Sequence, residues 1–162
     1  MKAFNTEIFT QFDKTWGLLC AGTMEHHNAM SISWGGMGTL WNKPVVTVYV
    51  NPLRYTYQFM EANEYFTVSF LPAELKKAHG VMGAKSGRDT DKDKEAHLTL
   101  VPAGESVTYA EAEVTLSAAK SIMTILRSTG CRPMSSRNTT SPNRCTACTS
   151  AKSLISSDKR RK

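Results

Sequence analysis

Short apolar runs bounded by turn residues recur through the first two thirds of the chain and predict a β-rich fold. Residues 45–50 are largely β-branched, lie between prolines and predict a strand. Residues 29–34 alternate apolar and polar positions, as a half-buried strand does. Further strands are predicted at 17–22, 65–70, 98–101 and 107–116, and helices at 55–62 and 73–82, the latter behind Pro72.

Strands at hairpin spacing with a few short helices favour a small barrel over a doubly wound sheet. The predicted fold class is therefore mainly β (β-rich α+β). Gly35, Gly36 and Gly38 follow the alternating strand and predict a bulge, a sharp bend or a close backbone approach there.

Charge divides the chain into two unlike segments. The sequence has 162 residues and a net charge of +6. Residues 1–117 hold 10 Lys/Arg against 13 Asp/Glu, whereas residues 118–162 hold 10 against Asp158 alone. All 14 aromatic residues lie at or before Tyr109, and 15 of the last 45 residues are Ser or Thr. We predict a domain at 1–117 and a tail at 118–162 without packed structure, because so little apolar surface cannot offset the entropy of ordering.

Polar groups beside an aromatic residue mark the first candidate site. In the segment 28–36, Ser31 and Ser33 fall on one strand face next to Trp34 and a flexible glycine backbone. Such a surface could hold a flat ligand with a polar edge. The alternative is an ordinary strand face with Trp34 in the core.

Two further segments have the chemistry of an anion site. Residues 51–57 join a strand end to a helix start and place Arg54 near the first turn, where a phosphate is favoured. Residues 86–92 form a polar loop that contains glycine and cations. The alternatives are a plain helix cap with a solvated arginine and a solvated loop.

Together, in this order, these segments resemble the flavin reductase-like family, the FMN-binding split-barrel proteins that include flavoredoxin. The resemblance extends over residues 10–117 and also rests on the motif at 17–22. It implies a homodimer with FMN near the subunit interface. Asn28, Ser31, Ser33 and Trp34 would contact the ring and ribityl portion, Met30 would line the pocket, Arg54 and Thr56 would hold the phosphate, and Ser86, Gly87 and Lys92 would close over the cofactor.

The resemblance implies an NAD(P)H:flavin oxidoreductase in which the flavin carries the chemistry and no protein residue is catalytic. NAD(P)H would be a transient donor, and a redox protein is a possible partner. The alternative is a flavoredoxin-type electron carrier without NAD(P)H turnover. A nucleic-acid binder using the basic run 159–162 is less favoured, because no aromatic residue is interleaved to stack on bases.

The remaining expectations concern metal and location. The histidines lack metal-ligand spacing, and Cys145 and Cys148 form an isolated pair without the second pair that a zinc site requires. No metal site is therefore expected. No apolar run reaches the roughly 20 residues that cross a membrane, and the first seven residues do not read as a secretory signal, so a cytoplasmic protein is expected.

The tail departs from the family pattern, which requires further strands, aromatics, a His and a Gly-Glu pair after residue 117. The codons that can encode residues 119–153 can also be read in a shifted frame that starts at the third base of each codon. With a permitted choice of codons, this frame encodes a family-like sequence that ends in M-H-R-M-Y-I-G-E-I. We hypothesise that the tail is an out-of-frame translation that begins near Ser117, which would leave the barrel incomplete at its C-terminal end. The bases across codons 112–125 test this hypothesis.

Overall fold

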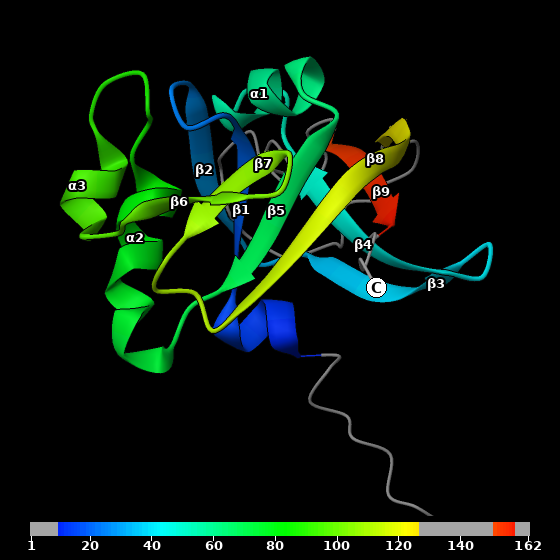
Figure 1. Cartoon of the computed structure of the whole chain (residues 1–162), viewed down its shortest axis with the longest axis horizontal. Helices are drawn as coiled ribbons and strands as arrows, with labels where there is room; N and C mark the ends of the chain where they lie inside the picture. The colour runs from blue at the N-terminus through cyan, green and yellow to red at the C-terminus, as the bar shows by residue number, and fades with distance from the viewer. Residues whose placement is uncertain (1–9, 127–150, 158–162) are drawn as a thin grey trace, which may run out of the picture.

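A computed structural model describes residues 10–126 and 151–157, and Figure 1 shows their arrangement. Its elements, in chain order, are η2 (Gln11–Thr15), β1 (Gly17–Gly22), β2 (His27–Ile32), β3 (Gly35–Leu40), β4 (Lys43–Val50), α1 (Thr56–Ala62), β5 (Tyr65–Phe70), η3 (Ala73–Leu75), α2 (Lys76–Ala84), α3 (Lys92–Ala96), β6 (Leu100–Ala103), β7 (Ser106–Tyr109), β8 (Val114–Leu126) and β9 (Ala151–Ser157).

The main sheet has the strand order β2-β1-β5-β8-β9-β4-β3, and every pairing in it is antiparallel. Its two edge strands, β2 and β3, are joined only by Ser33 and Trp34. Two linking residues span at most about 10 Å, whereas the edges of a flat seven-stranded sheet lie roughly 29 Å apart. The sheet must therefore curl until its edges approach, and the β-rich, split-barrel fold class predicted from the sequence is confirmed.

β1 is buried on both faces, which explains its unbroken apolar sequence. Leu19 and Ala21 point into the barrel core, which β4, β5 and α1 complete. Leu18 and Cys20 point outward into a second core under α2, α3 and β7. The green helices α2 and α3 consequently pack outside the barrel next to the hairpin β6-β7 (Figure 1).

The glycine run proved to be a regular strand, because Gly35, Gly36 and Gly38 all pair with β4. Gly35 has a packing reason: a Cβ there would lie 2.8 Å from the Thr47 carbonyl oxygen and 3.0 Å from the Phe12 ring. The close backbone approach was therefore the correct alternative at Gly35, where β3 begins as a strand separate from β2.

The predicted boundary at residue 117 falls inside β8, which continues to Leu126 and pairs with β5 and β9. Ala118 is buried in the barrel core, and β9 lies between β8 and β4. Residues 118–126 and 151–157 are therefore strand segments of the main sheet, and the division into a domain at 1–117 and a tail at 118–162 stays a prediction. The Cys145/Cys148 pair and the basic run 159–162 lie outside the described residues.

Candidate functional site

A pocket of about 180 Å³ lies where β2, the start of α1, the end of α2 and the loop to α3 meet. It is lined by the residues Asn28, Met30, Leu53, Arg54, Tyr55, Thr56, Met82, Gly83, Ala84, Lys85, Ser86, Gly87, Arg88 and Lys92. All three segments singled out in the sequence contribute to this one pocket.

The lining is strongly cationic. It includes Arg54, Lys85, Arg88 and Lys92 and no carboxylate. Arg54 donates from Nη1 to the Gly83 carbonyl oxygen at 3.2 Å, which ties the start of α1 to the end of α2. The Arg88 guanidinium lies 4.8 Å from the centroid of the Tyr55 ring, a cation-π distance. Such a set of donors favours an anion, with phosphate geometry suited to the arginine forks.

The loop that carries Ser86 and Gly87 lies close against Asn28 on β2. A Cβ on Gly87 would lie 2.1 Å from Asn28 Oδ1. The Asn28 side chain is itself fixed, because its Nδ2 donates to Thr56 Oγ1 at 2.7 Å and it is 5% exposed. A larger residue at position 87 would therefore force either Asn28 or the loop to move.

Lys92 is a buried cation at the inner wall of the pocket. Its side chain is 6% exposed, and its Nζ donates to the Ala29 carbonyl oxygen and, at 3.4 Å, to that of Met82. An ammonium has three donor hydrogens, so one remains for a ligand in the pocket. Burial, together with nearby Arg54, holds the pKa of Lys92 below its ordinary value against the opposing attraction of Asp93 and Cys20. A bound anion would favour the protonated lysine.

Three of the predicted residues do not line this pocket. Ser33 and Trp34 form the link between β2 and β3, and Trp34 is 65% exposed, so the alternative that placed it in the core is wrong. Ser31 donates to the His79 carbonyl oxygen at 2.9 Å and lies 3.0 Å from His79 Nδ1. The other predicted residues, Asn28, Met30, Arg54, Thr56, Ser86, Gly87 and Lys92, all line it.

Both Ser31 contacts are hydrogen bonds at once only when Nδ1 of His79 carries a proton. In that arrangement the serine hydroxyl donates to the carbonyl oxygen and its own oxygen accepts from Nδ1–H. His79 Nε2 is then a bare acceptor, buried and without a hydrogen-bond partner among the described residues. Burial and the nearby Lys76 lower the pKa of His79, in agreement with this neutral form.

Sequence reasoning did not assign Lys85, Arg88 or Tyr55 to the site. Arg88 belongs to the predicted polar loop, and its positive charge is a feature of the sequence that indicates a phosphate-binding residue. The contact of Arg88 with Tyr55 joins residues from two different elements, so no local pattern could reveal it.

A model of the flavin reductase like domain family matches residues 10–123 of the sequence. The chain belongs to this family. The match covers most of the chain and includes every residue of the pocket. No relative among curated proteins matches the sequence.

Solved structures of flavin proteins share the fold. Flavoredoxin of Desulfovibrio vulgaris (Miyazaki F) matches with a TM-score of 0.68 and 16% identity, over 100% of this chain and 76% of its own. An FMN-binding protein from Thermus thermophilus matches at 0.67 and 16%, over 90% and 68%. An NADH:FAD oxidoreductase from Streptomyces globisporus matches at 0.65 and 15%, over 90% and 73%. At these identities the likeness establishes the fold.

The residues present fit the phosphate end of a flavin nucleotide. The pocket lining combines four cations with no carboxylate, although Lys85 is paired with Glu95 at 2.7 Å, and it includes a loop whose Gly87 leaves no room for a Cβ. Within residues 10–126, no group of His, Cys, Asp or Glu side chains could hold a metal ion. No helix of the described chain is long and apolar enough to cross a membrane.

Proposed function

We propose that the protein binds FMN with its phosphate in the cationic pocket and works as an NAD(P)H:flavin oxidoreductase. The observation that carries this proposal is the convergence of Arg54, Arg88 and Lys92 on a pocket without carboxylates. Membership of the flavin reductase like domain family supports the flavin, and the likeness to flavin-binding proteins supports the same ligand class.

The small size of the pocket supports a binding mode in which only part of the FMN lies inside it. Pockets that enclose a drug-sized ligand measure about 300 to 1,000 Å³, and this one measures about 180 Å³. It accommodates the phosphate and part of the ribityl chain, while the ring extends beyond it. We expect Met30 to contact the ribityl chain, and Ser33 and Trp34 to lie on the ring side. A second copy of the chain would cover the exposed ring in the proposed homodimer.

Each lining residue has a distinct part in this proposal. Arg54 and Arg88 supply forked donors to the phosphate, and Lys92 supplies a point charge from the inner wall. Thr56 and Ser86 offer hydroxyls, although Ser86 Oγ already accepts from the Arg88 backbone N–H at 3.2 Å. Asn28 holds the pocket together through Thr56 rather than by charge.

When bound, the flavin supplies the hydride and electron transfer chemistry. The protein residues orient the cofactor through its phosphate and neutralise that phosphate. None of the described pocket residues is required as an acid or base for this role, so no catalytic residue is assigned. The nicotinamide donor would bind transiently against the ring.

A second candidate is an FMN electron carrier that does not turn over NAD(P)H. The likeness to flavoredoxin of Desulfovibrio vulgaris favours it. A redox protein would then be the partner. The homodimer and the cytoplasmic location stay predictions.

Two measurements test the proposal. Purified protein is titrated with FMN and with riboflavin, which lacks the phosphate, and the flavin fluorescence is followed. We expect FMN to bind more tightly than riboflavin, and Arg54→Ala to reduce this preference. Anaerobic mixing with NADH or NADPH then separates the two candidates, because bleaching of the visible flavin band supports the reductase and its absence supports the carrier. A colourless protein that takes up no FMN would contradict both.

A further inference from the structure

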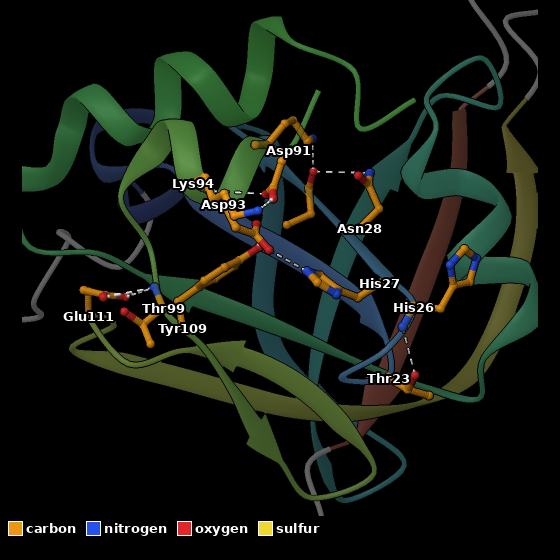
Figure 2. A network of polar contacts seen from close by, with 12 residues as sticks. Thr23, His26, His27, Asn28, Asp91, Asp93, Lys94, Thr99, Tyr109 and Glu111 are labelled. Atoms are coloured by element: carbon orange, nitrogen blue, oxygen red, sulfur yellow. Dashed lines mark hydrogen bonds and ion pairs between the residues drawn. The ribbon is translucent and has the colours of Figure 1, made fainter. Parts of the chain in front are cut away.

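A second polar cluster surrounds Asp93, the residue that follows Lys92 of the pocket. His27 on β2 and Tyr109 on β7 converge on the carboxylate of Asp93 on α3, as Figure 2 shows. His27 Nε2 lies 2.7 Å from Asp93 Oδ2, and the Tyr109 hydroxyl donates to Asp93 Oδ1 at 2.6 Å. Both carboxylate oxygens therefore have a short contact, each to a different strand.

The cluster is partly closed off from solvent. Tyr109 is 2% exposed, and the side chains of His27 and Asp93 are 18% and 22% exposed. Burial disfavours the charge on Asp93, but the bonds from His27 and Tyr109 outweigh it and hold the pKa of Asp93 below its ordinary value. Asp93 is thus a fixed anion that anchors α3 to the sheet.

Asp93 follows Lys92, the cation at the inner wall of the pocket. The Lys92 side chain contacts the backbone of β2 at Ala29, and Asp93 contacts β2 at His27. α3 is a helix of five residues. Its other ion pairs, Lys85 with Glu95 and Lys94 with Asp91, involve side chains 37% to 86% exposed. Asp93 is therefore the least exposed carboxylate in the ion pairs of this short helix, and it lies next to Lys92 in the sequence.

We propose that Asp93, clamped by His27 and Tyr109, is a positioning residue that sets the Lys92 ammonium at the phosphate end of the flavin pocket. This inference rests on the proposed function. Asp93 touches no part of the bound ligand in this arrangement and acts only through Lys92.

The test compares FMN with riboflavin, because only FMN carries the phosphate that Lys92 would meet. Asp93→Ala should weaken FMN binding by about tenfold and leave riboflavin binding unchanged. Asp93→Asn keeps the shape of the side chain and a carbonyl acceptor for Tyr109, so it should weaken FMN binding less than Asp93→Ala does. Asp91→Asn is the matched control, because it removes a carboxylate that caps the same helix and asparagine caps equally well; it should change neither affinity.

A double substitution separates positioning from general damage. If Asp93 acts through Lys92, Asp93→Ala combined with Lys92→Met should bind FMN no more weakly than Lys92→Met alone. Additive losses, or equal losses for FMN and riboflavin, would overturn the positioning role. If Asp93→Ala does not fold, Tyr109→Phe removes the hydroxyl that donates to Asp93, and it should also lower the preference for FMN over riboflavin.

The flavin affinities of wild-type protein and of the variants distinguish the proposed function from the role of Asp93. Wild-type protein that binds neither flavin overturns the proposed function, and the role of Asp93 with it. Wild-type protein that prefers FMN, with a preference unchanged in both Asp93→Ala and Tyr109→Phe, overturns the role of Asp93 alone.

Discussion

Replacing Gly87 by alanine tests the architecture of the pocket most directly. The new Cβ would lie 2.1 Å from Asn28 Oδ1, 3.2 Å from Asn28 Cγ and 3.4 Å from Tyr55 Cδ1. A separation of 2.1 Å lies well below the 3.0 Å that real Cβ contacts require. Either the asparagine or the loop must move.

The asparagine cannot move cheaply. Its Nδ2 donates to Thr56 Oγ1 and, at 3.3 Å, to the Ala29 carbonyl oxygen, and the residue is almost completely buried. Breaking these bonds would leave buried polar groups without partners. We therefore expect the loop to shift by roughly 1 Å, enough to lose one hydrogen bond to the charged phosphate, which is worth about 1.5 to 3 kcal/mol. FMN affinity should fall ten- to a hundredfold, about 1.4 to 2.8 kcal/mol.

Stability should change much less than affinity. Alanine restricts the unfolded chain by about 0.4 to 1 kcal/mol, which offsets part of the strain in a loop that is half-exposed. The assays are a fluorescence titration with FMN and a thermal melt. Gly80→Ala is the matched control, because nothing lies within 4 Å of a Cβ there. It should leave FMN affinity unchanged and stabilise α2 by about 0.5 to 1 kcal/mol. Wild-type FMN affinity in Gly87→Ala would refute the reasoning.

Three further predictions concern pH, thiol chemistry and the tail. FMN affinity should fall as pH rises through the lowered pKa of Lys92, and Lys92→Met should flatten this pH profile. Without flavin, the free energy of unfolding should rise with pH between the lowered pKa of Lys92 and the ordinary lysine pKa, because the unfolded chain binds more protons than the folded chain in that range. Burial, reinforced by Asp93, raises the pKa of Cys20 to about 12, so a thiol reagent should not label the Cys20 peptide until the protein unfolds, and rapid labelling of folded protein would contradict this. A gene corrected to the shifted frame after codon 117 should give a chain with a higher melting temperature and tighter FMN binding, whereas equal melting of both chains would count against the frameshift hypothesis.

The sequence predicted the site segments better than the individual contacts. Local chemistry singled out Arg54 and the polar loop at 86–92, because a cation after a strand end and a glycine in a polar loop are visible in a few neighbouring letters. The resemblance to the family gave Gly87, Lys92 and Ser31 their expected contacts with the flavin. In the structure the Ser31 hydroxyl instead meets His79 on α2, a partner 48 residues away. Strand alternation tells which face a side chain occupies but not which element covers that face.

Local pattern indicated β1, β2, β4, β5, α1 and α2, since β-branched runs and proline punctuation act within a few residues, but it did not reveal β3 or the strand segments after residue 117. It also separated an acidic first segment from a basic last one. Only the tertiary structure decided that Lys92 is buried, that Asp93 is held by His27 and Tyr109, and that Arg88 lies over Tyr55. These contacts join elements far apart in sequence, and they exist because the sheet curls and brings the outer helices against its strands.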